Sequence, residues 1–187
     1  MKHTLLIITA LMLVVGFTSG QEPIDGSTLV SKDSLQYAPG SDKPYSGEAV
    51  WYYENGQKWT EGTYKNGELD GKWTVWYENG QKQREGNSKD GELDGKWTVW
   101  YENGQKMSEE YYRDGKPYGL VTNWWENGQK MDEGIWKEFG PHGLRTSWYP
   151  NGQKSGKTLY EDGVKISQEC WDESGDECEC IVPGDCN

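Results

Sequence analysis

The chain has 187 residues, a formal net charge of −12 and 33% hydrophobic residues, with 11 Trp and 12 Tyr. This length suits one ordinary domain, and so few aliphatic side chains exclude a thick Leu/Ile/Val core. The acidic charge argues against nucleic acid or anionic membrane as a partner, since both would repel the chain; it favours a basic protein partner or simply keeps an aromatic-rich fold soluble.

Residues 1–20 have the features of a secretory signal peptide. Lys2 and His3 precede an apolar run from Leu5 to Phe17, and small residues at 18–20 offer a cleavage site. The run is shorter than the ~20 residues of a bilayer span, which disfavours the alternative of a membrane anchor. We therefore expect a secreted, periplasmic or cell-surface protein with no stable membrane span. The mature chain would carry 18 basic and 31 acidic residues, a net charge of −13.

Two segments precede the repetitive part of the chain. Residues 21–34 are polar, and we expect a flexible lead-in there. Residues 35–46 contain the turn sequence Pro39-Gly40-Ser41-Asp42 and predict an irregular N-terminal capping hairpin. Pro44 cannot donate a ladder hydrogen bond, which suits the edge of a sheet.

A repeat of 24 residues dominates residues 47–166. The tetrapeptide Asn-Gly-Gln-Lys marks it five times, and the units span 47–70, 71–94, 95–118, 119–142 and 143–166. In the second unit a β-branched and aromatic stretch, Lys72 to Tyr77, is followed by Asn79-Gly80, a pair suited to positive φ and a tight hairpin turn. A more polar strand follows, and Asp90-Gly91 then turns the chain into the next unit. In the fourth unit Glu138-Phe139-Gly140 replaces that second turn, so we expect a reshaped loop.

Each unit is therefore predicted to be one β-hairpin. Twenty-four residues are too few for a propeller blade, and the Leu ladder of leucine-rich repeats is missing. The predicted fold is all-β: an antiparallel meander of tandem 24-residue hairpins that forms one long, twisted, mostly single-layer sheet.

The pattern Gly-Lys-Trp-x-x-Trp-Tyr-Glu-Asn-Gly-Gln-Lys resembles the bacterial variant of the MORN repeat, as found in YwqK-like antitoxin components. The resemblance covers about residues 35–178. It implies a single-layer β scaffold that binds partners or lipids and has no catalytic residues. The signal peptide and the Cys-rich end depart from a simple antitoxin.

Residues 167–187 predict a degraded sixth hairpin and a Cys-rich cap. Trp171-Asp172-Glu173-Ser174-Gly175 echoes the repeat turn, and Cys170 and Cys178 flank it symmetrically. We expect these two to face each other and favour disulfides Cys170–Cys178 and Cys180–Cys186, with the crossed pairing as the alternative. A Cys-only zinc site is the other alternative, but its spacing lacks the usual two-residue gaps.

No catalytic constellation is evident, and we expect neither an enzyme nor a cofactor or metal. After removal of the signal peptide His142 is the sole histidine, and it lies at a turn position. One histidine without a recurring nucleophile disfavours a hydrolytic triad. The recurring acids Glu61, Glu85, Glu109 and Glu133 are better explained as solvated residues or as cross-strand partners of lysines than as catalytic carboxylates.

Aromatic rows are the candidate partner-binding residues. One repeat position holds Tyr52, Trp76, Trp100, Trp124 and Trp148, and the next holds Tyr53, Tyr77, Tyr101, Trp125 and Tyr149. Neighbouring strand residues face opposite sides, so both faces should carry a row. A third row, Tyr64, Tyr112, Trp136 and Tyr160, is interrupted by Ser88. These rings either form the core between hairpins, where Trp76→Ala or Trp100→Ala would cost about 3–5 kcal/mol, or remain exposed as a platform. The partner-binding candidates are Trp76, Trp100, Trp124, Trp148, Tyr77, Tyr101 and Trp125.

Three functions remain open. The first is a protein-binding scaffold, antitoxin- or immunity-like toward a basic toxin, in which charge steers association and aromatic rings anchor the partner. The second is an envelope or matrix scaffold whose rings stack on glycan or another surface polymer. The third, an enzyme, would need an acid or histidine cluster that the sequence does not show.

Overall fold

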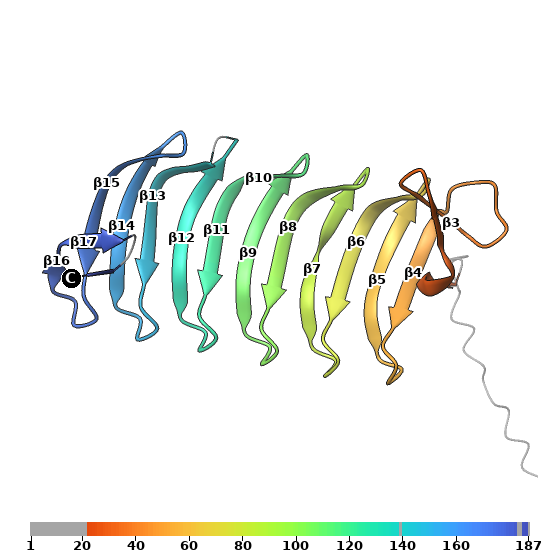
Figure 1. Ribbon diagram of the computed structural model, residues 1–187, viewed down its shortest axis with the longest axis horizontal. Coiled ribbons are helices and arrows are strands. Elements are labelled where there is room, and N and C mark those ends of the chain that lie inside the picture. Colours follow the sequence, from red (N-terminus) through yellow and green to blue (C-terminus); the bar gives the residue numbers. More distant parts are fainter. Residues whose placement is uncertain (1–21, 139, 183–184, 187) are drawn as a thin grey trace, which may run out of the picture.

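In the computed structural model, which describes residues 22–138, 140–182 and 185–186, the chain forms one long sheet that does not close into a barrel (Figure 1). The all-β prediction and the meander of hairpins are confirmed. The main sheet has the strand order β1-β4-β5-β6-β7-β8-β9-β11-β12-β13-β14-β15-β16, and β10 pairs with β9 beside this path. Every pairing is antiparallel except that of β1 with β4. The elements are β1 (Ile24–Asp25), the 3-10 helix η1 (Gly26–Thr28), β2 (Val30–Lys32), β3 (Leu35–Tyr37), β4 (Gly47–Tyr52), β5 (Lys58–Lys65), β6 (Glu68–Trp76), β7 (Lys82–Lys89), β8 (Glu92–Trp100), β9 (Lys106–Arg113), β10 (Lys116–Pro117), β11 (Gly119–Trp124), β12 (Lys130–Lys137), β13 (Gly140–Trp148), β14 (Lys154–Glu161), β15 (Val164–Trp171), β16 (Glu177–Cys178), β17 (Cys180–Val182) and β18 (Asp185–Cys186).

The tight two-residue turns lie along the edge at the top of Figure 1. At Asp90-Gly91 both residues have positive φ, 48° and 80°, as a type I′ turn requires. The same geometry recurs at Asn66-Gly67, Asp114-Gly115 and Asp162-Gly163. At the fourth such position Lys137 pairs with Gly140, and Phe139 lies outside the described residues.

The Asn-Gly turns, along the lower edge, differ from the sequence prediction. Here only the glycine has positive φ, 82° at Gly80, and the loop is longer: the Gly80 amide donates to Tyr77 O at 2.9 Å and the Tyr77 amide donates to Gln81 O at 2.8 Å. The reason is the Asn79 side chain, whose Oδ1 accepts from the Gln81 amide at 2.9 Å and whose Nδ2 donates to Glu102 O of the next turn at 3.1 Å. The asparagine therefore stabilises a wider turn and links it to its neighbour.

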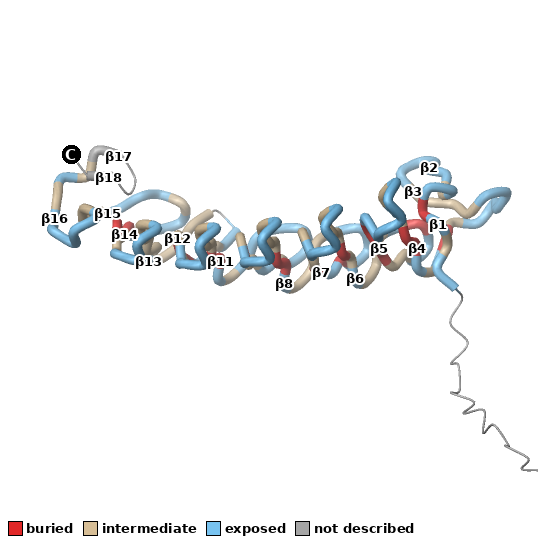
Figure 2. Tube along the Cα trace, turned by 90° about the horizontal axis from the view of Figure 1, so that it is seen from below, coloured by how far each residue is buried: buried red, intermediate tan, exposed pale blue. Residues whose placement is uncertain are grey.

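The sheet is one layer thick, and its buried residues form a line along its middle (Figure 2). Thr74 is fully buried on one face, and Trp97 is 7% exposed on the other. Glycines make room for the rings: a Cβ on Gly86 would lie 2.2 Å from the Trp97 ring, and one on Gly62 would lie 2.2 Å from Trp73. Rings lying flat on the backbone of the neighbouring strand thus supply the core that aliphatic side chains provide elsewhere.

The N-terminal cap begins earlier than predicted. Within the segment expected to be a flexible lead-in, β1 pairs with β4 and η1 follows, so that Gly26 lies against the ring of Trp51. The irregular hairpin predicted within 35–46 is present: Tyr37 and Pro44 form an antiparallel bridge, and the Tyr45 amide donates to Gln36 O at 2.7 Å. A further hairpin, β2–β3, precedes it at residues 30–37. It bends back toward the sheet, where the Gln36 amide donates to Gly67 O at 2.9 Å.

The C-terminal cap contains the sixth hairpin, and the favoured disulfide pairing is wrong. Cys170 and Cys178 are register partners between β15 and β16, as expected, and Cys180 pairs in register with Cys186. The bond, however, joins Cys170 to Cys180, whose Cα atoms are 5.5 Å apart. The physical reason is that β16 ends after two residues and β17 begins just beyond Glu179, so Cys180 comes within reach of Cys170 on β15. The crossed alternative had this bond; the pairing of the other two cysteines lies outside the described side chains.

Both caps rise on the same side of the sheet (Figure 2). That side carries Trp51 and Cys170, the residues that the caps contact. The other side carries the row Tyr52, Trp76, Trp100, Trp124 and Trp148, because adjacent strand residues alternate between faces. This second side is here named the lysine–tryptophan face. Of the described N-terminal residues, Pro23 borders it beside Glu48 and Lys58, whereas both caps rise on the opposite side.

Candidate functional site

The tryptophans of the lysine–tryptophan face form a ladder with lysines of the preceding hairpin. Each lysine follows an Asn-Gly-Gln turn, at the start of the second strand, and its ammonium lies over the ring that ends the first strand of the next unit. Such cation–π contacts contribute about 0.5–1 kcal/mol at exposed sites. The Nζ-to-centroid distances are 5.6 Å for Lys58 and Trp76, 5.8 Å for Lys82 and Trp100, 5.4 Å for Lys106 and Trp124, 5.7 Å for Lys130 and Trp148, and 5.5 Å for Lys154 and Trp171.

The same lysines pair with the recurring glutamates three residues along the same strand, so the expected pairing with lysine is present but these pairs are not cross-strand. The Nζ-to-Oε2 distances are 2.6 Å for Lys58 and Glu61, 2.5 Å for Lys82 and Glu85, 2.7 Å for Lys106 and Glu109, and 2.5 Å for Lys130 and Glu133. In the second and third units a further lysine joins: Lys72 is 3.0 Å from Glu85, and Lys96 is 2.7 Å from Glu109.

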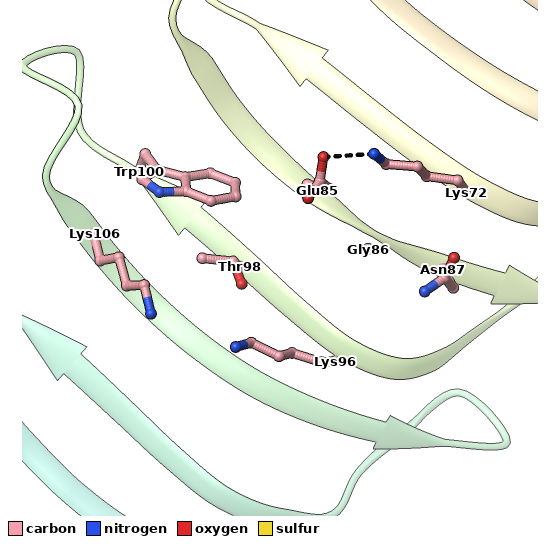
Figure 3. A pocket seen from close by; sticks show the side chains of 8 residues that line it. All are labelled: Lys72, Glu85, Gly86, Asn87, Lys96, Thr98, Trp100 and Lys106. Atoms are coloured by element: carbon pink, nitrogen blue, oxygen red, sulfur yellow. Dashed lines mark ion pairs between the residues drawn. The ribbon is translucent and has the colours of Figure 1, made fainter.

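A shallow hollow of about 390 Å³ lies where these two units meet (Figure 3). Burial alone would raise the pKa of Glu85, but hydrogen bonds from Lys82 and Lys72 outweigh it and lower that pKa. The pKa of Glu109 is lowered in the same way by Lys106 and Lys96. Both carboxylates therefore stay ionised, but each is shared by two lysines, so the hollow keeps a net positive charge. Its lining residues are Lys72, Glu85, Gly86, Asn87, Lys96, Thr98, Trp100 and Lys106.

The predicted site residues are all half-buried, and they divide between two rows. Trp76, Trp100, Trp124 and Trp148 belong to the ladder just described. Tyr77, Tyr101 and Trp125 connect consecutive hairpins: the Tyr77 hydroxyl donates to Trp100 O at 2.8 Å, the Tyr101 hydroxyl to Trp124 O at 2.8 Å, and the Trp125 indole to Trp148 O at 3.0 Å. The structure gives this second row a role in holding the units together, whatever else it binds.

An exposed aliphatic row lies on the same face in the fourth and fifth units, and the sequence analysis missed it. Leu120 pairs with Ile135 between β11 and β12, and Leu144 pairs with Leu159 between β13 and β14, so the four side chains run across four consecutive strands. Their exposed fractions are 42% for Leu120, 39% for Ile135, 52% for Leu144 and 42% for Leu159.

The signal for this row was present in the repeat. At the repeat position of Leu120 and Leu144, the second and third units carry Lys72 and Lys96. At the repeat position of Ile135 and Leu159, the same two units carry Asn87 and Tyr111. The fourth and fifth units are thus apolar at two repeat positions where the second and third units are charged or polar. Comparison of units position by position would have found this difference.

The free acidic charge lies along the two edges of the sheet. The lower turns carry exposed Glu54, Glu78, Glu102 and Glu126, and the upper turns carry exposed Glu68, Asp90, Glu92, Asp114 and Asp162. The upper turns also carry exposed basic residues, namely Lys65, Lys89, Arg113, Lys116 and Lys137. The lysine–tryptophan face is therefore an aromatic and partly aliphatic strip between an acidic lower margin and an upper margin of mixed charge.

The opposite face holds an ion pair that the sequence analysis also missed. Asp132 is 5% exposed, and its Oδ1 is 3.2 Å from Nη2 and 3.3 Å from Nε of Arg145. The Asn123 amide donates to the same carboxylate at 3.2 Å. Other units have Thr60, Arg84, Ser108 and Gly156 at the position of Asp132, so this pair is local to the fourth and fifth units.

The single histidine of the described residues lies near a turn, away from the lysine–tryptophan ladder. His142 Nδ1 is 3.5 Å from Asp162 Oδ1 at an upper turn. The part of the chain that the structure describes has no group of three His, Cys, Asp or Glu residues placed to hold a metal ion. It also has no helix long and apolar enough to cross a membrane.

A family comparison agrees with this geometry. The model of the MORN repeat variant matches residues 45–66, 69–90, 93–114 and 141–162. The second range spans β6 and β7, and the third spans β8 and β9, so one match corresponds to one hairpin. No curated protein matches the chain.

Proposed function

Because the chain is built of MORN-variant repeats, we propose that it is a non-catalytic scaffold whose lysine–tryptophan face binds a protein partner. The exposed row of Leu120, Ile135, Leu144 and Leu159 carries this proposal. Protein interfaces have an apolar centre within a polar rim, and here the row lies beside half-buried tryptophans and between charged edges. Both caps rise on the opposite side of the sheet (Figure 2).

The partner's chemistry follows from the charges. The lysines of the first four ladder steps are each paired with a glutamate, whereas the acids of the lower margin face solvent. A partner with basic residues around an apolar patch fits such a surface. Charges at the rim act mainly on the association rate, and apolar anchors act mainly on dissociation. A basic toxin would have these properties. We therefore propose, more specifically, that the chain is a secreted or cell-surface protein with an antitoxin-like role.

Protein binding is favoured over glycan stacking by the lysines. Sugars stack on the free face of an aromatic ring, and each tryptophan of the ladder already has an ammonium over a face at 5.4 to 5.8 Å. An aliphatic row offers a sugar no stacking surface, whereas it is suited to the apolar centre of a protein interface.

The test replaces Leu120 and Leu144 together by lysine, the residue that the second and third units carry at the same position. The fold accommodates lysine there, so the double variant should remain folded. Wild-type mature chain would first capture its partner from the native organism, and the purified partner would then be measured against both proteins. We expect dissociation from the double variant to be roughly 30-fold faster, as for loss of a hot spot of about 2 kcal/mol.

The matched control is Val164→Lys, which places a lysine on an aliphatic residue that is 63% exposed on β15, outside the row. It should bind as wild type does. Association should slow steeply from low to physiological ionic strength, since exposed charges are screened. Equal binding by L120K/L144K and wild type would contradict the proposed face, and salt-independent association would contradict the basic partner.

A further inference from the structure

Ser88 interrupts a row of rings on the face opposite the lysine–tryptophan face. The same repeat position holds Tyr64 in the first unit, Tyr112 in the third and Tyr160 in the fifth, with Trp136 in the fourth. In the first unit the Tyr64 ring is packed between two other rings. Its centroid lies 6.3 Å from the centroid of Tyr45 and 6.4 Å from that of Trp51. At Ser88 the backbone remains in strand β7, paired with Leu93, but the side chain ends at a hydroxyl.

A hollow of about 380 Å³ occurs at this gap. That volume is within the range of small-ligand sites, roughly 300–1,000 Å³. Its walls are mostly apolar and come from four consecutive strands, β6 to β9. The lining residues are Leu69, Trp73, Arg84, Ser88, Gly91, Leu93, Trp97, Val99, Ser108, Glu110 and Tyr112.

The walls are held in place independently of any ligand. Trp97 lies on Gly86, and its indole nitrogen donates to Asn87 O at 2.8 Å. Trp73 lies on Gly62 and is 6.0 Å from Trp51, centroid to centroid. A pocket with fixed walls loses little entropy when a ligand binds, which favours binding.

Ser88, one of the residues that line the hollow, carries a buried polar group that is unsatisfied. The Ser88 hydroxyl is on a residue only 4% exposed, and it has no hydrogen-bond partner among the described residues. Leaving such a group unpaired costs about 1–3 kcal/mol. The neighbouring Glu110 carboxylate already accepts from the Tyr112 hydroxyl at 2.5 Å, and the pKa of that phenol is raised to about 12 by burial and by this bond.

We propose that this hollow binds the phenol ring of a ligand from outside the chain. The ring occupies the place that tyrosine holds in the first, third and fifth units, between Trp73 and Trp97, and the phenol hydroxyl bonds to Ser88. Such a ring is available from a tyrosine side chain of another protein or from a small free phenol. The site lies on the other face from the proposed partner row and does not depend on it.

The experiment titrates full mature chain with p-cresol, the free form of the tyrosine side chain, and follows indole N–H resonances by NMR. We expect saturable shifts at Trp73 and Trp97 with a Kd on the order of millimolar, and none at Trp76 or Trp100 of the other face. Toluene has the same ring without the hydroxyl, and it should bind roughly fivefold more weakly, as loss of one hydrogen bond predicts. Ser88→Ala should remove that difference.

Ser88→Tyr fills the hollow from within and should abolish p-cresol binding. The matched control is Lys89→Tyr, which adds the same ring at an exposed position of the same strand outside the hollow and should leave binding intact. Shifts of equal size in S88Y and wild type would overturn the proposal, as would no shift at Trp73 and Trp97 up to the solubility limit. The shift map of the wild-type chain decides the matter even if S88Y does not fold.

A second arm distinguishes the two sources of the ring. Capped tyrosine, N-acetyl-tyrosine methylamide, carries the peptide bonds of a protein on both sides. Binding of both probes supports a tyrosine on a partner's surface, and binding of p-cresol alone supports a small phenolic ligand.

Discussion

Trp97→Ala should lower the free energy of unfolding by about 3–5 kcal/mol, the cost of removing a buried large ring. Trp97 is 7% exposed, its ring fills the space above Gly86, and its indole nitrogen donates to Asn87 O at 2.8 Å. The substitution removes the buried ring, its packing on Gly86 and its hydrogen bond to Asn87 O, all at the centre of the sheet. Urea unfolding of the mature chain, followed by circular dichroism, measures the effect.

The matched control is Trp100→Ala, three residues along the same strand. Trp100 is half-buried near the lower edge, so its loss should cost clearly less than that of Trp97. This order revises the sequence expectation, which assigned the large cost to the positions of Trp76 and Trp100. Equal urea midpoints for the two variants would show that the flat rings on glycine are not the core.

Arg145→Ala should cost about 3 kcal/mol, because it leaves the Asp132 carboxylate buried without its charge partner. The carboxylate would keep only the Asn123 amide. The Arg145 side chain is 36% exposed, which places the cost at the lower end for broken buried pairs. Thermal or urea unfolding of the variant and of wild type measures this loss in the free energy of unfolding.

A second substitution identifies the cause. Asp132→Ser introduces the residue that the third unit has at this position, Ser108, and removes the stranded charge. The double variant R145A/D132S should recover most of the lost stability, with a coupling energy of at least about 1 kcal/mol. Additive effects of the two substitutions would mean that Arg145 acts through packing on Trp136, whose centroid is 5.9 Å away, rather than through Asp132.

The repeat made the architecture predictable because each unit repeats the same local rules. A β-branched and aromatic stretch, a turn and a polar strand can bury their rings only against the next unit, so the period alone predicts a growing sheet. The lysine–glutamate pairs were predictable for the same reason. The turn types were less predictable. Asn79 was expected to form a tight turn because asparagine tolerates positive φ, whereas its side chain uses both polar atoms to stabilise a longer loop.

Departures from the repeat were harder to predict. The bond between Cys170 and Cys180 depends on where β16 ends, and no periodicity specifies the end of the array. The apolar row and the hollow at Ser88 both arise where single units change one residue of the pattern. A sequence shows such a change, but only the register between strands shows that Leu120 and Ile135 are neighbours and that Ser88 leaves a space.

The most direct test of partner binding on the lysine–tryptophan face is the methyl NMR spectrum of the mature chain with and without its captured protein partner. The account predicts that the methyl resonances of Leu120, Ile135, Leu144 and Leu159 shift or broaden together at stoichiometric partner, while those of Leu69 and Leu93 on the opposite face stay in place. Unchanged resonances for the four residues of the row, with a partner demonstrably bound, would contradict it.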